Sequence, residues 1–187
     1  DVGGPTMVRA AAKNYNDVTV ITSTDYYSEL INELKKNKGS TSLKFREKMS
    51  RLAFEETSYY EAVISNYFNK FNNINFPKRK ILYTNLVENL RYGENPHQIG
   101  AFYSQNIKNK LDQIHGKNLS YNNYSDIFAA LTISKSLPKN KGTVIVKHGN
   151  PCGVSALKNN LDSYKLALGS DPISAFGGIV SCNYKIT

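Results

Sequence analysis

Lys147 and His148 are the adjacent pair best suited to do chemistry in this 187-residue chain. They follow the apolar run 142–146, which predicts a buried strand. Open α/β sheets place ligand crevices at the carboxyl ends of their strands, so both side chains are expected at such a crevice. Lysine supplies a fixed positive charge, and histidine can accept a proton near neutral pH. The alternative is a strand end that exposes two polar side chains to water.

The residues after this pair are also unusual. Gly149, Pro151 and Gly153 predict a rigid turn whose backbone can come close to a substrate. Arg91 and Tyr92 form a second candidate pair, because guanidinium suits a phosphate and an aromatic ring suits a heterocycle. An ordinary surface pair is the alternative there.

Lys13 lies on a short, Ala-rich segment, 6–14, that predicts a helix with Arg9 on the same face. Without further information it is a solvated lysine. His97 and His115 are expected to be ordinary loop histidines.

No metal or redox cofactor is expected. His148 and Cys152 faintly resemble a zinc deaminase motif, but no Glu stands two residues after the histidine and there is no C-x-x-C pair. The glycine pairs 3–4 and 177–178 do not fit a dinucleotide fingerprint or a phosphate-binding P-loop.

The helices and strands expected around these residues fall into two stretches of the chain. After an opening turn, the first half predicts a helix at 6–14 and a strand at 18–21. Two more helices are expected, from Thr24 to Gly39 and from 40 to about 70. This order is typical of the closing half of an α/β unit. Residues 72–80 are polar and contain a proline, which predicts a linker.

The second half alternates short strands with polar loops and helices. Strands are expected at 81–90, 101–103, 142–146 and 179–182, polar loops at 91–98 and 115–123, and helices at 161–168 and after a cap at Ser125. The fold class is therefore α/β.

The amino-acid composition excludes several classes of protein. Forty per cent apolar residues provide a globular core, and two cysteines are too few for a secreted disulfide framework. No apolar run approaches the ~18 residues of a membrane span. A soluble, cytoplasmic protein with no membrane partner is expected. The net charge of +9 is scattered along the chain, so nucleic acid is not the expected partner, although a basic nucleic-acid-binding module remains an alternative.

Five blocks of the sequence together resemble a known family. The first resembles the cyclohydrolase signature of the bifunctional purine-biosynthesis family AICAR transformylase/IMP cyclohydrolase, and four resemble its transformylase domain. These blocks are 1–14, followed in family order by 90–98, 119–123, 146–153 and 174–178.

The resemblance implies an internal stretch of a longer chain. Residues 1–76 would be the C-terminal part of the cyclohydrolase domain, and residues 77–187 the N-terminal part of the transformylase domain. The implied fold is the end of a doubly wound, methylglyoxal-synthase-like domain and then the start of a cytidine-deaminase-like mixed α/β domain. The family is a homodimer whose transformylase sites combine both subunits. An incomplete, inactive fragment is the alternative.

The resemblance also implies roles for individual residues. Lys147 matches the transition-state-stabilising lysine and His148 the proton acceptor of formyl transfer. The expected AICAR-binding residues are Arg91, Tyr92 and Gly177.

The cyclohydrolase block implies a second set of roles. Lys13 matches the proton acceptor of ring closure, while Asp1 and Val2 fall where the purine product binds. The implied reactions are formyl transfer from the co-substrate 10-formyltetrahydrofolate to AICAR, giving FAICAR, and cyclisation of FAICAR to IMP with loss of water. Neither reaction needs a catalytic metal.

Overall fold

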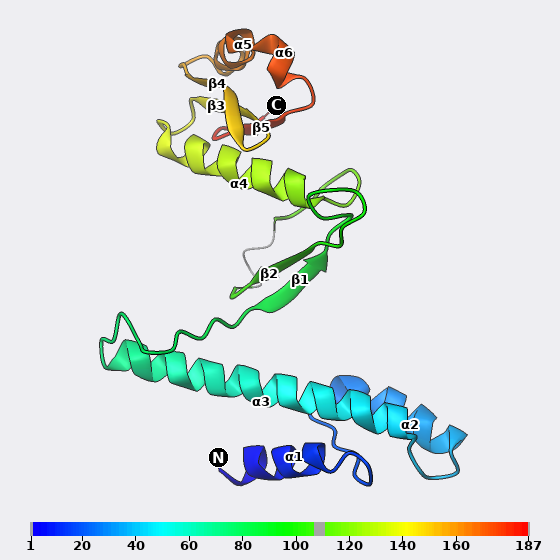
Figure 1. The fold of residues 1–187 in the computed structure, drawn as a ribbon. Helices are drawn as coiled ribbons and strands as arrows, with labels where there is room; N and C mark the ends of the chain where they lie inside the picture. Colours follow the sequence, from blue (N-terminus) through cyan, green and yellow to red (C-terminus); the bar gives the residue numbers. More distant parts are fainter. Residues whose placement is uncertain (1, 107–110, 187) are drawn as a thin grey trace. The chain divides into compact units, whose positions relative to one another are not determined.

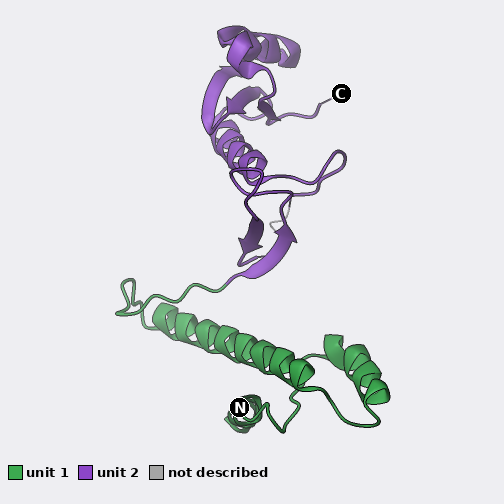
Figure 2. Ribbon diagram, turned by 45° about the vertical axis from the view of Figure 1, so that its right-hand side comes forward, with its two compact units in different colours: residues 1–83 green, residues 84–187 purple. Residues whose placement is uncertain are grey.

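The computed structural model describes residues 2–106 and 111–186. The chain divides into two compact units, Asp1–Tyr83 and Thr84–Thr187 (Figure 2). Each unit has its own internal packing. No helix in the described parts of the chain is long and apolar enough to cross a membrane.

The first unit is helical. Its elements are α1 (Gly3–Lys13), the short 3-10 helix η1 (Thr24–Tyr26), α2 (Tyr27–Lys36) and α3 (Leu43–Phe71), as Figure 1 shows. Ser42 starts α3 because its hydroxyl accepts a hydrogen bond from the Phe45 amide at 3.3 Å. Lys38 and Gly39, with φ of 53° and 89°, are the left-handed residues after α2. The predicted helices are therefore confirmed within a few residues.

Helices α1 and α3 pack against each other through small and apolar side chains. Ala12, Met49 and Ala53 are almost fully buried. Ser50 donates a hydrogen bond of 2.7 Å to the Ala12 carbonyl, which satisfies a polar group at the end of α1. The Arg46 guanidinium donates to the loop carbonyls after α1 and so ties that loop to α3.

The predicted strand at 18–21 is wrong. These residues are outside any strand or helix, and no strand occurs among the described residues of this unit. A β-branched run becomes a strand only when a neighbouring strand takes up its backbone hydrogen bonds. Among the described residues, the run has no such neighbour.

The described residues of the second unit form two antiparallel sheets. β1 (Asn85–Asn89) pairs with β2 (Ala101–Ser104), and a second sheet has the order β4-β3-β5. Its strands are β3 (Gly142–Lys147), β4 (Asn150–Ala156) and β5 (Ile179–Cys182). The helices are α4 (Tyr121–Ser136), α5 (Asn160–Ser170) and α6 (Pro172–Ala175). The mixed α/β class is confirmed.

Strand β3 is the centre of the larger sheet and is covered on both faces. Val144 and Val146 pack on Ala130 of α4, whereas Ile145 packs on Ala167 of α5. Figure 1 shows α4 on one side of the strands and α5 with α6 on the other. Burial on both faces explains why the strand reads as a continuous apolar run.

The N-cap of helix α4 is Ser120, five residues earlier than the predicted cap at Ser125. The Ser120 hydroxyl accepts from the Asn123 amide, and the Asn123 side chain accepts from the Ser120 amide. This reciprocal capping box satisfies two backbone donors, so it is a stronger start signal than a lone serine. The loop predicted to reach residue 123 therefore ends at residue 120.

Gly153→Ala is expected to destabilise the second unit. A Cβ at Gly153 would lie 1.8 Å from the Ala167 carbonyl oxygen of α5, so strand and helix would have to separate. Overpacking against rigid backbone costs about 1–3 kcal/mol or more. The unfolding midpoint of the full-length protein measures the effect. Gly169→Ala is the matched control, since a Cβ there meets nothing within 4 Å. Equal midpoints for both variants would contradict the close approach.

Candidate active site

The turn between β3 and β4 carries the first candidate residues. Lys147 pairs with Asn150 across the two strands, so only His148 and Gly149 form the connection. Their φ angles are 54° and 73°. Positive φ at both central residues is the requirement of the tight hairpin turn that matches strand twist.

The predicted longer turn is therefore wrong, because Pro151 and Gly153 belong to β4. Lys147 and His148 do not lie at the open α/β sheet edge that was expected either, since β3 pairs antiparallel with both neighbours. The hairpin turn, and not a parallel strand end, presents the pair.

Lys147 is half-buried and anchored. Its Nζ donates a hydrogen bond of 2.8 Å to the Phe176 carbonyl. The loop after α6 approaches β3 closely, since a Cβ at Gly178 would lie 2.9 Å from the Val146 carbonyl oxygen. Gly177, with φ of 76°, lies between these contacts. The structure therefore brings Gly177 next to the backbone group that holds Lys147.

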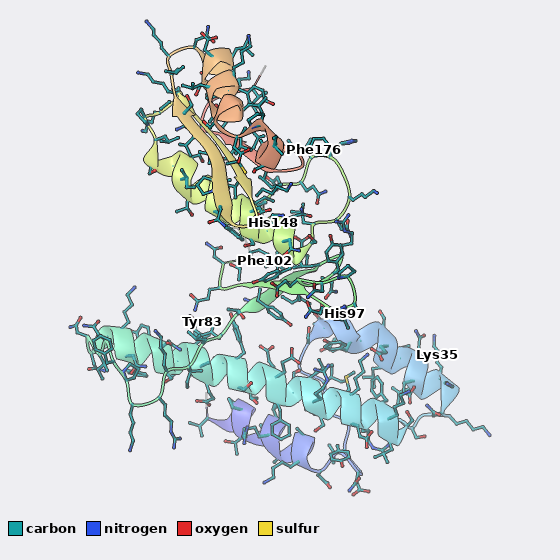
Figure 3. The ribbon with its side chains drawn as sticks, turned by 45° about the horizontal axis from the view of Figure 1, so that its top comes forward. Lys35, Tyr83, His97, Phe102, His148 and Phe176 are labelled. Atoms are coloured by element: carbon teal, nitrogen blue, oxygen red, sulfur yellow. The ribbon has the colours of Figure 1, made fainter. Side chains whose placement is uncertain are left out.

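His148 is exposed at the tip of the hairpin (Figure 3). Its own carbonyl accepts from the Asn150 side chain at 3.0 Å. The next amide, that of Gly149, donates to Asp126 of α4 at 2.7 Å. The backbone of the turn is thus held from two sides while the imidazole faces solvent.

A hollow of about 370 Å³ lies against this turn. Its lining residues are Lys147, His148, Asn150, Pro151, Cys152, Asp171 and Ser174. Lys147 and His148 therefore share one hollow. Polar and charged groups dominate its wall, which suits a polar ligand.

Asp171 and Ser174 were missed by the sequence reasoning. Asp171 caps α6 by accepting from the Ser174 amide at 3.0 Å, and hydrogen bonding from Ser174 lowers the pKa of Asp171 from its ordinary value. The carboxylate is therefore ionised at neutral pH. An Asp-Pro pair at the start of a helix was the available signal.

Arg91 and Tyr92 lie in the loop between β1 and β2. The Arg91 guanidinium carbon is 4.9 Å from the Tyr92 ring centre, and Arg91 donates to the Tyr92 hydroxyl at 3.2 Å. Hydrogen bonds from Ser120 and from Arg91, and then the Arg91 charge, lower the pKa of Tyr92. The Tyr121 amide at the start of α4 donates to the Tyr92 carbonyl at 3.2 Å.

Neither Arg91 nor Tyr92 lines the hollow beside His148. The link between the two places is α4, which begins at Tyr121 beside Tyr92 and reaches Asp126, beside Gly149, five residues later. That interval is an axial rise of about 7.5 Å. Both candidate parts are therefore attached to the first turns of one helix.

Among the described candidate residues of the first unit, Val2 and Lys13 do not line a common hollow. Val2 precedes α1 and Lys13 ends it, and both are exposed. Lys13 lies ten positions after Gly3 along the helix, a rise of about 15 Å. Val2 lines a separate hollow of about 460 Å³ that includes Arg9 and Glu61 but not Lys13. Asp1 lies outside the described residues.

Metal ligands are not clustered in the parts of the chain that the structure describes. No group of three or more His, Cys, Asp or Glu residues that could hold a metal ion occurs within residues 2–106 and 111–186.

Known proteins match this chain over nearly its whole length. The model of the family described as AICARFT/IMPCHase bienzyme matches residues 11–187. The chain belongs to this family.

Three relatives of the chain carry the name "Bifunctional purine biosynthesis protein PurH". The chain is 43% identical over 189 residues to the one from Bradyrhizobium diazoefficiens, covering 98% of this chain and 36% of the relative. It is 43% identical over 192 residues to that from Acetivibrio thermocellus and 45% identical over 201 residues to that from Buchnera aphidicola, covering all of this chain and 37% of each relative. The chain thus spans little more than a third of these bienzyme relatives.

Proposed function

We propose that the full-length protein carries out the last two steps of de novo IMP synthesis. It transfers a formyl group from 10-formyltetrahydrofolate to AICAR, and it closes the product FAICAR to IMP with loss of water. The supporting observation is that Lys147 and His148 share one polar hollow in a chain of the AICARFT/IMPCHase family.

His148 acts as the proton acceptor of formyl transfer. The AICAR amine is a poor nucleophile because its lone pair is delocalised into the imidazole and carboxamide. Its nitrogen attacks the formyl carbon, a new C–N bond forms, and the bond from that carbon to the folate nitrogen breaks. The imidazole takes the amine proton, and the departing folate nitrogen takes a proton in its place.

Lys147 stabilises the oxygen of the formyl group as negative charge develops there. An ammonium has three N–H donors, and the Phe176 carbonyl accepts one of them. The described contacts leave the other donors for a substrate oxygen or for the departing folate nitrogen. Because Phe176 fixes the ammonium beforehand, little reorganisation is needed during the reaction.

Arg91, Tyr92 and Gly177 bind the AICAR nucleotide in this proposal. The exposed Arg91 guanidinium suits the phosphate, and the Tyr92 ring suits the heterocycle. The backbone of Gly177, beside the carbonyl that holds Lys147, comes close to the ligand because glycine has no side chain.

We propose that the chain spans the junction of two domains. Residues 1–76 belong to a doubly wound cyclohydrolase domain and residues 77–187 to a cytidine-deaminase-like transformylase domain, in a homodimer whose transformylase sites combine both subunits. The compact units divide at Tyr83, within the segment that joins α3 to β1.

Calorimetry of AICAR with the full-length protein tests the proposal. Saturable binding, together with formyl transfer when the folate is added, is the expected result. A nucleic-acid-binding module would instead bind DNA or RNA with an affinity that falls steeply with salt concentration. Binding of that kind without AICAR binding would overturn the proposed function.

Lys13→Ala is expected to impair ring closure alone. Loss of a proton acceptor lowers a rate by roughly 10²–10⁴-fold. Formyl transfer to AICAR should be unchanged, and turnover of preformed FAICAR measures the ring closure. Lys35→Ala is the matched control, because Lys35 is also an exposed lysine in the last turn of a helix. Unchanged ring closure in Lys13→Ala would remove Lys13 from the mechanism.

A further inference from the structure

Asp126 joins α4 to the turn that carries His148. Its Oδ1 accepts a hydrogen bond of 2.7 Å from the Gly149 amide, across 23 positions of sequence. The side chain is partly buried on the second turn of α4. A hydrogen bond to a carboxylate is stronger than one between neutral groups.

The turn that Asp126 holds is conformationally demanding. His148 has φ of 54°, a left-handed conformation that residues other than glycine rarely adopt. Such conformations persist where surrounding contacts enforce them. Asp126 and the Asn150 side chain supply those contacts, one at the Gly149 amide and one at the His148 carbonyl.

The same helix also holds the other candidate residues. The Tyr121 amide donates to the Tyr92 carbonyl, and the Asn122 side chain donates to the Glu94 carbonyl at 2.9 Å. The first turns of α4 are thereby fixed to the loop that contains Arg91 and Tyr92. Asp126 connects that helix to the His148 turn through its hydrogen bond with the Gly149 amide.

We infer that Asp126 is a positioning residue for formyl transfer: it holds the His148–Gly149 turn on α4 and so sets the placement of the His148 imidazole relative to Arg91 and Tyr92. This inference rests on the proposed function. Lys147 does not depend on Asp126 in the same way, because the Phe176 carbonyl anchors its ammonium independently.

Steady-state kinetics of the full-length protein provide the first test. Asp126→Ala is expected to lower kcat for formyl transfer by roughly 10–100-fold and to change KM for AICAR by less than about threefold, because small misplacement of a reacting group mainly slows the chemical step. Asp126→Asn keeps an oxygen that accepts from Gly149 and should stay within about threefold of wild type. Asp162→Ala, an exposed aspartate in the first turn of α5, is the control and should leave kcat unchanged.

A double-variant cycle separates positioning from general loss of structure. In a His148→Ala background, Asp126→Ala should lower the remaining rate by less than about threefold, because both changes act through one imidazole. A loss of the same size with and without His148 would overturn the inference. Full activity of Asp126→Ala, or Asp126→Asn as slow as Asp126→Ala, would overturn it as well.

Amide hydrogen exchange tests the contact without reference to activity. Exchange at Gly149 in the full-length protein should be about tenfold or more faster in Asp126→Ala than in wild type, and close to wild type in Asp126→Asn. Equal exchange in all three proteins would overturn the contact itself. A different outcome is that Gly149 exchanges faster in Asp126→Ala but the wild-type protein transfers no formyl group. That outcome would overturn the proposed function and the kinetic role of Asp126, while the contact would stand.

Discussion

His148→Ala in the full-length protein is expected to lower the rate of formyl transfer by roughly 10²–10⁴-fold, the usual effect of losing a general base. The imidazole is exposed at the hairpin tip and lines the hollow that Lys147 also lines. No other described residue that lines this hollow is a histidine. Cyclohydrolase turnover of preformed FAICAR should be unaffected. Parallel assays of the two reactions measure this separation.

Substitution at His148 also affects the backbone, since φ there is 54°. His148→Asn is therefore a second variant, because asparagine tolerates the left-handed conformation but does not take up a proton near neutral pH. Both variants should lose formyl transfer to a similar extent. His115→Ala, an exposed loop histidine, is the matched control and should behave as wild type. Loss of both activities together, or of neither, would show that the role given to His148 is wrong.

Lys147→Met is expected to lower formyl transfer by roughly 10²–10³-fold, the effect of removing one preorganised donor to a developing negative charge. Methionine keeps most of the apolar stem and loses the charge and the hydrogen bond to the Phe176 carbonyl. The rate of formyl transfer at saturating AICAR and folate measures the effect. Lys165→Met on the exposed face of α5 is the control.

Lys147→Arg distinguishes a placed donor from a positive charge in general. A guanidinium is planar and larger, so it does not reproduce the geometry of an ammonium held at 2.8 Å from the Phe176 carbonyl. Arginine should restore little of the rate. Full activity of Lys147→Arg would mean that charge alone suffices, and full activity of Lys147→Met would exclude Lys147 from the reaction.

The sequence predicted those helices and strands that are determined by their own residue pattern. The continuous apolar run of β3 and the apolar spacing of α3 are visible in the sequence because both elements bury their own residues. The run 18–21 is also β-branched, but in the part of the chain that the structure describes no strand lies beside it, and no local signal in the sequence reveals this. The start of α4 was misplaced because Ser120 and Ser125 both resemble caps, and only Ser120 has the reciprocal Asn123 partner.

The site could be predicted only in part, for a related reason. Lys147 and His148 were recognisable from residue type and position, although the hairpin turn that presents them was not. Asp126 reaches the Gly149 amide only because α4 packs on β3, a contact between distant segments. The roles of Arg91 and Lys13 rest on family resemblance, since an exposed Arg-Tyr pair or a solvated lysine is common on protein surfaces.

The most direct test of the account is a crystal structure of the full-length protein with AICAR bound. The account predicts that the AICAR amine nitrogen lies about 2.6–3.2 Å from an imidazole nitrogen of His148, or is joined to it through one water. It also predicts the phosphate beside Arg91. A nucleotide bound with its amine beyond the reach of His148 would show that His148 is not the proton acceptor of formyl transfer.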